Sequence, residues 1–213
     1  IAGLPLEGME SFHRSFNDVY SLHPHQLQLG FLKVLKGSDM ERRADLYGIR
    51  HQSHPPYEVL ATDSLSCDEI LHLHDVCDAV DLYYNSLQYT VTIGHLTEDF
   101  GDAFHTFEAL AAFEKEETAG QETPGDSLAE RKMSRMDRIS LLRRFGAVNF
   151  PEKLSLYEET LLLDLYLREN SRMRPSWAGE SGEQKQIMKK WMKENRENDK
   201  RMAHVEIFTH DVL

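Results

Sequence analysis

Eleven histidines are the first side chains in this sequence that could bind a metal or transfer a proton. His72, His74, Cys77 and Asp78 fall in one predicted helix, where the four-residue spacing of His74 and Asp78 would let both side chains reach one metal ion. His72 and His74 are two residues apart and point to different sides of that helix, and Cys77 belongs to its apolar stripe. We interpret the group as surface histidines and a core cysteine, with a metal site as the alternative.

The two cysteines, Cys67 and Cys77, have nine residues between them. That spacing matches neither a zinc ribbon nor an iron–sulfur motif. We expect reduced thiols rather than a disulfide. The sequence also contains no glycine-rich phosphate loop, nucleophile elbow or metalloprotease helix. It therefore predicts no catalytic residue and no metal ligand within this chain.

Asp164 lies inside an apolar run, which gives two interpretations. It could be a buried carboxylate with a raised pKa. The interpretation we favour is a structural ion pair with one of three nearby arginines, the first of them four residues further on: Arg168, Arg172 or Arg174.

A second group of polar and aromatic side chains follows this run: Arg172, Arg174, Pro175 and Trp177. Such a group could bind an anion or stack on an aromatic ligand. We favour a segment that ends a helix and packs against its own domain.

The charge is acidic overall, with 36 Asp and Glu against 24 Lys and Arg and a formal net charge of −12. This balance argues against nucleic acid or an anionic membrane as the main partner, because phosphate contacts need an excess of Lys and Arg on one face. Residues 57–117 carry 14 acidic residues and a single basic one, Lys115. We interpret this acidic stretch as solvated helix faces; a docking face for a basic partner is the alternative.

The chain length of 213 residues suffices for one domain of ordinary size or two small ones. No apolar run approaches the roughly 20 residues that a membrane helix needs, and no positively charged leader precedes an apolar core. We expect a cytoplasmic protein.

The first 37 residues predict a strand, a helix and a second strand. Ile1–Pro5 is an apolar run that ends in a turn, and the apolar residues between Met9 and Tyr20 recur at helical spacing. Residues 26–35 are mostly apolar and predict a strand buried on both faces. Together they predict a βαβ unit, which normally belongs to a larger parallel sheet. Because unpaired edges invite association, we expect these strands to pair with a partner, for which a second copy of the chain is one candidate.

The remaining residues predict a mostly helical domain. A short helix over 39–47 ends at Gly48, a short strand covers 57–61, and Ser66 with Glu69 forms a capping box that opens a long helix. Four further helices are predicted over 98–115, 127–145, 152–169 and 183–198, the third at the centre of a bundle, with a closing strand over 204–208. The fold class is α+β, mostly α.

Several segments resemble one known family. Ile1-Ala-Gly-Leu-Pro5 with Glu7, followed by residues 27–38, resembles the late strands of the radical S-adenosylmethionine (radical SAM) barrel. The continuation resembles the cobalamin-binding type of radical SAM protein with an uncharacterised C-terminal helical domain. The segments that carry this second likeness are Pro55-Pro-Tyr-Glu-Val-Leu60, Asp81-Leu-Tyr-Tyr-Asn-Ser86, Asp164-Leu-Tyr-Leu-Arg-Glu169 and Arg174-Pro-Ser-Trp177.

The resemblance implies an enzyme in which three cysteines of a C-x3-C-x2-C loop hold a 4Fe–4S cluster that cleaves S-adenosylmethionine into methionine and a 5′-deoxyadenosyl radical. Cys67 and Cys77 do not match that loop, so the cluster would be bound upstream of Ile1, as would cobalamin where it is used. The resemblance also implies that the main chain of Leu32, Lys33 and Val34 lies against the adenine of S-adenosylmethionine in an intact barrel.

We therefore expect a C-terminal fragment of a radical SAM enzyme that is inert on its own. Residues 1–37 would be the remnant of the barrel, with the upstream barrel as their partner, and residues 38–213 an accessory helical domain that covers the barrel or shapes substrate access. The alternative is a non-enzymatic helical interaction module that binds a basic partner through its acidic face.

Overall fold

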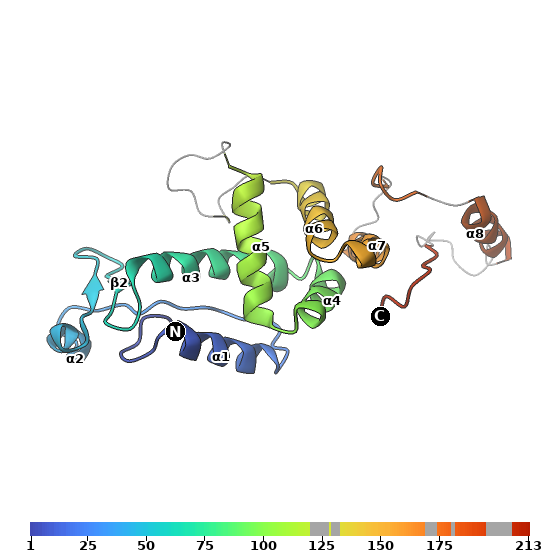
Figure 1. The fold of residues 1–213 in the computed structure, drawn as a ribbon. Helices are drawn as coiled ribbons and strands as arrows, with labels where there is room; N and C mark the ends of the chain where they lie inside the picture. Colours follow the sequence, from blue (N-terminus) through green and yellow to red (C-terminus); the bar gives the residue numbers. More distant parts are fainter. Residues whose placement is uncertain (120–127, 129–132, 169–173, 180–181, 195–205) are drawn as a thin grey trace. The chain divides into compact units, whose positions relative to one another are not determined.

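The computed structural model describes residues 1–119, 128, 133–168, 174–179, 182–194 and 206–213 (Figure 1). It is mostly helical, with one small antiparallel sheet of two strands. The chain forms two compact units. Unit 1 comprises residues 1–86 and 96–132, and unit 2 comprises residues 87–95 and 133–213. Residues 1–37 thus belong to unit 1, and the domain boundary predicted at residue 37 stays a prediction.

Unit 1 begins with a strand-like segment, a helix and a second strand-like segment. The predicted helix is confirmed as α1 (Met9–Tyr20), which buries Phe12 and Phe16. The segments on either side pair in parallel, but only through an isolated bridge between Ala2 and Phe31. The prediction of a continuous strand over 26–35 is wrong, because side chains from later helices take part of the main-chain bonding of this segment, as described below.

Main-chain hydrogen bonds connect four segments of unit 1. The Leu32 N–H donates to the carbonyl of Ala2, and the Leu32 carbonyl accepts from the Val59 N–H, both at 2.9 Å. Val59 begins β2 (Val59–Ala61), which pairs antiparallel with β1 (Arg50–His51). The predicted strand over 57–61 is therefore confirmed in its last three residues, and it joins the N-terminal segments to the rest of unit 1.

Gly3 provides a test of this packing. Its φ of +82° lies in the left-handed region, and a Cβ there would lie 2.6 Å from Cγ1 of Val59, which is buried. We expect Gly3→Ala to lower the free energy of unfolding of unit 1 by about 2–4 kcal/mol, from backbone strain and overpacking. Gly30→Ala is the matched control, because its Cβ would meet only Ile1 at 3.8 Å. Urea unfolding followed by circular dichroism measures both, and equal effects would contradict the prediction.

The long helices of unit 1 follow. Short turns, α2 (Asp39–Arg42) and a 3-10 helix (Ala44–Tyr47), end at Gly48 in the left-handed conformation, as predicted. The capping box of Ser66 and Glu69 is confirmed at the start of α3 (Cys67–Ala79), which continues as a π-helix, η2 (Val80–Asn85). Helix α3 packs against α5 (Ala103–Glu117), and so does α1 (Figure 1).

The helix predicted over 98–115 is two helices, α4 (Thr90–Phe100) and α5. Gly101 has a φ of +68° and ends the first, and the Asp102 side chain accepts from the His105 N–H and caps the second. Since a single left-handed glycine suffices to end a helix, the apolar pattern that runs across it was misleading.

Unit 2 is built on α6 (Arg135–Asn149) and α7 (Leu154–Arg168), which pack against each other. A 3-10 turn, η4 (Pro151–Lys153), connects them, and α8 (Gly182–Glu194) follows. Leu161, Leu162 and Leu165 of α7 are buried, as its apolar run predicts, whereas Leu167 is exposed. Residues 206–208 form no strand, and residues 204–205 of the predicted closing strand lie outside the described part of the chain.

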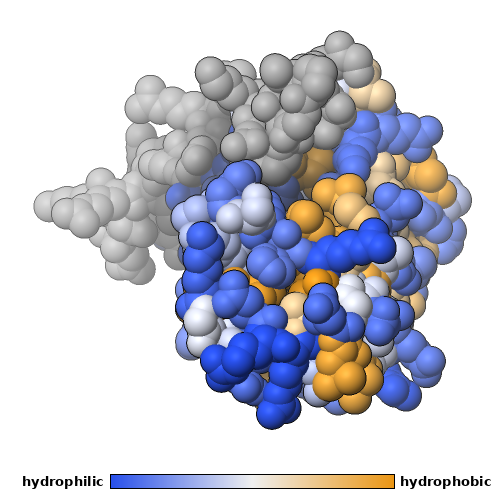
Figure 2. Space-filling model, turned by 90° about the vertical axis from the view of Figure 1, so that its left-hand side faces the viewer, coloured by the Kyte–Doolittle hydropathy of each residue, from blue (hydrophilic) through white to orange (hydrophobic). Residues whose placement is uncertain are grey.

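The face that carries α2 and β2 is largely hydrophilic and shows apolar residues in separate patches (Figure 2). Among the described residues, no helix is long and apolar enough to span a membrane.

Candidate functional site

The segment that the resemblance places in the barrel is held by the end of the long helix of unit 1. Asn85 of η2 accepts from the Leu27 N–H at 2.8 Å and donates to the Leu27 carbonyl at 2.9 Å. The Tyr84 hydroxyl donates to the Pro24 carbonyl. Because Tyr84 and Asn85 belong to the motif Asp81–Ser86, part of the sequence pattern singled out above serves to position residues 24–29.

Helix α3 contacts the same segment further along. The His74 ring stacks on Phe31, with 3.6 Å between ring centroids, and its Nε2 lies 3.1 Å from the Glu58 carboxylate. Glu58 belongs to the motif Pro55–Leu60 and precedes β2. His74 thus holds Phe31 against α3, and this position explains the histidine without a metal.

Leu32, Lys33 and Val34 lie between the Ala2 segment and β2. Val34 is fully buried and its N–H donates to the Tyr57 carbonyl at 2.9 Å, while Lys33 is exposed. The Leu32 N–H and carbonyl both have main-chain partners, Ala2 and Val59. The contact of these three residues with adenine stays a prediction.

Cys77 faces this segment as well, with its Sγ 3.9 Å from the Leu29 carbonyl. Burial raises the pKa of the Cys77 thiol to about 12, with further contributions from Asp81, Asp78 and Glu58. The thiolate is the form that binds metals and attacks electrophiles. Cys77 is therefore a protonated, structural thiol at neutral pH.

His72 points to the other side of α3, as its two-residue spacing from His74 predicts. Its Nε2 lies 2.7 Å from one oxygen of Glu108 on α5, and His105 Nδ1 lies 3.0 Å from the other oxygen. Within the described residues, no group of three or more His, Cys, Asp or Glu could hold a metal ion. Glu108 was not among the candidates predicted from the sequence, although its three-residue spacing from His105 indicates that the two side chains lie on the same helix face.

A similar pair joins α1 to α5, since His13 Nε2 lies 2.6 Å from the Asp102 carboxylate. Histidines of unit 1 thus contact part of the acidic stretch 57–117: Glu58, Asp102 and Glu108 each face at least one. This pairing accounts for three carboxylates that the sequence assigned to solvated faces.

The Glu108 pair predicts a pH dependence. Burial alone would raise the pKa of Glu108, but hydrogen bonds and charges from His105 and His72 outweigh it and lower the pKa. A lowered folded-state pKa adds stability above the unfolded value of about 4, and this stability is lost as pH falls through the folded-state pKa. We expect the stability advantage of the wild type over Glu108→Gln to disappear as the pH falls below the unfolded-state pKa of about 4. Urea unfolding at each pH measures it, and an advantage that persists at the acidic end would contradict the assignment.

Asp164 is buried in unit 2, but not paired as predicted. Its two carboxylate oxygens accept from the N–H groups of Val91 and Thr92, at 3.0 and 2.9 Å, in the first turn of α4. Burial raises the pKa of Asp164, against the lowering effect of these hydrogen bonds and of Arg135. Among the described residues Arg168 makes no ion pair with Asp164 and Arg174 pairs with Glu206, so the ion pairs predicted with these two arginines are wrong. Arg172 lies outside the described residues.

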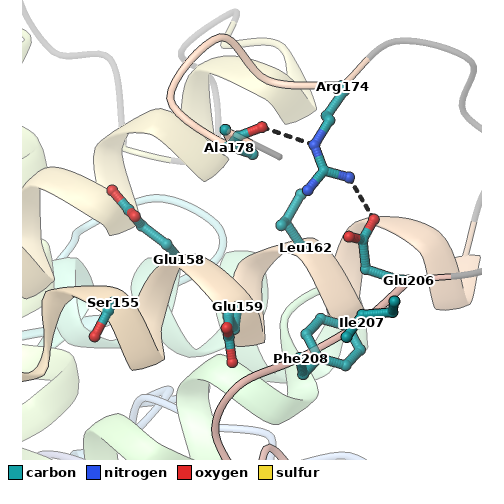
Figure 3. Close-up of a pocket in the computed structure, with 10 residues that line it drawn as sticks. Ser155, Glu158, Glu159, Leu162, Arg174, Ala178, Glu206, Ile207 and Phe208 are labelled. Atoms are coloured by element: carbon teal, nitrogen blue, oxygen red, sulfur yellow. Dashed lines mark hydrogen bonds and ion pairs between the residues drawn. The ribbon is translucent and has the colours of Figure 1, made fainter. Parts of the chain in front are cut away.

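A cavity of about 110 Å³ lies in unit 2 between α7 and the C-terminal segment (Figure 3). Arg174 spans it, donating from Nε to the Ala178 carbonyl and pairing with Glu206. Glu158 and Glu159 of α7 also line the cavity, and Glu159 lies nearer to Phe208 than Glu158 does. The Glu158 carboxylate is bound by Arg143, whose guanidinium lies over the Trp177 ring. Arg174 and Trp177 thus pack within their own unit, as we favoured.

Comparison with protein families gives a match over most of the chain. The model of a family described as a protein of unknown function, DUF4080, matches residues 45–212. The chain belongs to the DUF4080 family. Searches of curated proteins and of solved structures gave no match.

The DUF4080 region begins after α1 and α2 and contains the later helices of both units. Glu58, His74, Cys77 and Asn85 lie within the matched region, and the segment that they hold, residues 27–34, precedes it. The DUF4080 region therefore binds residues 27–34 through side chains as well as through β2.

Proposed function

We propose that this chain is the C-terminal part of a radical SAM iron–sulfur enzyme, in which the DUF4080 region covers the barrel or shapes substrate access. The observation that carries the proposal is the parallel bridge between Ala2 and Phe31 across α1. A parallel crossover of this kind normally belongs to a larger parallel sheet, because its strands need further partners. The sequence likeness of the same residues to the late barrel strands supports it.

The contacts to residues 27–34 give the DUF4080 region a role in this proposal. Asn85, Tyr84 and His74 hold the segment whose main chain would face the adenine of S-adenosylmethionine at Leu32, Lys33 and Val34. A change in these contacts would move the segment and so alter how the cofactor sits. The cluster itself needs three cysteines, and Cys67 and Cys77 do not supply them, so its ligands and any cobalamin-binding domain would lie upstream of Ile1.

The first test is the reading frame upstream of Ile1. We expect a C-x3-C-x2-C motif in frame, and a start codon directly before Ile1 would overturn the proposal. The longer chain, purified without oxygen and reconstituted with iron and sulfide, should absorb visible light as a 4Fe–4S protein and form 5′-deoxyadenosine from S-adenosylmethionine. Absence of both in a reconstituted sample would also overturn it.

Asn85→Ala in that longer chain tests the role of the DUF4080 region. We expect the cluster absorbance to be retained and 5′-deoxyadenosine formation to fall, because residues 24–29 lose two hydrogen bonds. Asn149→Ala is the matched control, since Asn149 also donates to a main-chain carbonyl, that of Phe145 in unit 2. Equal rates in the two variants would contradict the role.

A helical interaction module with an acidic docking face is the second candidate. Asp68, Asp81, Glu116 and Glu117 are exposed in the acidic stretch, which favours it. A lysine-rich peptide should then bind the chain with strong salt dependence, and charge reversal at Asp68 and Asp81 should weaken the binding. A homodimer formed through the edges of the N-terminal segments is a third arrangement. The molecular mass measured by light scattering would be twice that of the chain.

A further inference from the structure

A serine, a histidine and a glutamate of unit 2 form a row of hydrogen-bonding groups. Ser155 Oγ lies 3.3 Å from His210 Nε2, and His210 Nδ1 lies 3.0 Å from the Glu159 carboxylate. We propose that Ser155, His210 and Glu159 form an acyl-transfer site that hydrolyses small carboxylic esters. This inference does not depend on the radical SAM proposal.

Local structure brings the three groups together. Ser155 is the second residue of α7, and Glu159, four residues later, lies on the same face of that helix. Glu159 also accepts from the N–H groups of Thr209 and His210, at 2.8 and 2.9 Å, and from the Thr209 hydroxyl. These bonds hold the C-terminal segment against α7, so the position of the His210 ring is set by several contacts.

The hydrogen bonds determine which nitrogen of His210 carries the proton. Burial alone would raise the pKa of Glu159, but the hydrogen bonds from Thr209 and His210 outweigh it and lower the pKa, so Glu159 is an ionised acceptor. His210 Nδ1 therefore donates to Glu159, and the lone pair of Nε2 is left to accept the proton of the Ser155 hydroxyl. This is the arrangement of roles that activates a serine nucleophile.

The cavity beside the row limits the substrate. Ser155 and Glu159 line it together with the apolar side chains of Leu162, Ala178 and Phe208 (Figure 3). At about 110 Å³ it has room for a short acyl chain. Ser155 is exposed and the His210 side chain is 38% exposed, so an ester can reach the hydroxyl from solvent.

The reaction balances in two steps. Ser155 Oγ attacks the ester carbonyl while its proton passes to His210 Nε2; the bond from Oγ to the acyl carbon forms, the bond to the leaving oxygen breaks, and that oxygen takes the proton from Nε2. Water then attacks the acyl carbon and gives a proton to Nε2. The bond from Oγ to the acyl carbon breaks, Oγ takes the proton back from Nε2, and the carboxylic acid leaves. No oxidant or reductant is needed.

The test measures hydrolysis of p-nitrophenyl acetate by the full chain. General-base catalysis contributes about 10²–10⁴-fold, so we expect saturable turnover above buffer that falls by about 100-fold or more in Ser155→Ala and His210→Gln. Ser140→Ala is the matched control, because the Ser140 hydroxyl bonds its own helix, at the Met136 carbonyl. No turnover above buffer, or an unchanged rate in Ser155→Ala, would overturn the proposal.

Covalent labelling gives a readout that does not depend on turnover. A fluorophosphonate probe should modify Ser155, as mapped by peptide mass spectrometry, and should not modify the His210→Gln variant. Labelling spread over other serines, or no labelling at all, would overturn the proposal even if esters were hydrolysed.

Glu159 is a positioning residue, and its test separates kcat from KM. In Glu159→Gln the Nδ1–H of His210 loses its charged acceptor and the ring is held less firmly against Ser155, so kcat should fall while KM changes little. Glu152→Gln is the control, since Glu152 is exposed on η4 and does not line the cavity. A kcat in Glu159→Gln equal to that of the wild type would contradict the assigned role.

Discussion

Asp164→Ala is expected to destabilise unit 2 by about 2–4 kcal/mol, because it leaves two N–H groups at the start of α4 without an acceptor. Asp164 is 1% exposed and Thr92 is fully buried, so water cannot readily replace the lost carboxylate. Urea unfolding followed by tryptophan fluorescence reports on this unit, since both tryptophans, Trp177 and Trp191, belong to it. Asp211→Ala, at an exposed carboxylate, is the control and should change stability by less than about 0.5 kcal/mol.

Asp164→Asn separates the carboxylate charge from the hydrogen bonds. The amide keeps one acceptor oxygen, so we expect a smaller loss than in Asp164→Ala. The raised pKa of Asp164 means that its contribution to stability is full below its unfolded pKa of about 4 and declines as pH rises through the folded-state pKa. That decline should be absent in Asp164→Asn. If the free energy of unfolding of Asp164→Ala is within about 0.5 kcal/mol of the wild-type value, the capping role is wrong.

The sequence around Asp164 predicts its burial but not its hydrogen-bond partners. An apolar run around an aspartate predicts burial, and burial was found. Its partner could not be predicted, because the N–H groups that it binds lie 72 and 73 residues earlier in the chain. Arginines close in sequence were the only candidates that local spacing offered, and the one described in an ion pair, Arg174, binds Glu206 instead.

Signals contained within a few residues were predictable. The Ser66 and Glu69 capping box and the left-handed Gly48 were both found where the sequence placed them, because each depends on its own turn alone. The continuous strand predicted over 26–35 was not found, because a strand forms only where neighbouring strands supply hydrogen-bonding partners along its length. The segment instead makes one parallel bridge, one antiparallel bridge and side-chain contacts with α3 and η2.

In the candidate sites too, contacts within one helix were predictable and contacts between distant segments were not. His72 and His74 were correctly assigned to opposite sides of a helix, because helical spacing fixes this. The contact of His74 with Phe31, and the row of Ser155, Glu159 and His210, join residues that are far apart in sequence. No local pattern marks Ser155 as a nucleophile, and only the placement of the C-terminal segment against α7 brings His210 to it.

The aromatic cluster around Phe107 gives the largest expected effect in unit 1. Phe107 is fully buried on α5, and its ring lies 6.1 Å from Phe16 and 5.9 Å from Tyr20, both on α1, and 6.4 Å from Tyr84. Truncation of a buried phenylalanine leaves a cavity that the surrounding rings fill only in part. We expect Phe107→Ala to lower the free energy of unfolding of unit 1 by about 3–5 kcal/mol.

Because Phe107 joins α5 to α1, truncation of its side chain should loosen α1 before the rest of unit 1. Hydrogen exchange at the α1 amides should therefore accelerate more than exchange in α3, whose capping box and packing on β2 remain intact. Leu71→Ala is the control, because Leu71 is 58% exposed on α3. Its truncation should change the free energy of unfolding and the hydrogen-exchange rates only slightly. Uniform acceleration across α1 and α3 would mean that unit 1 opens as a whole, and that α1 is held by more than this cluster.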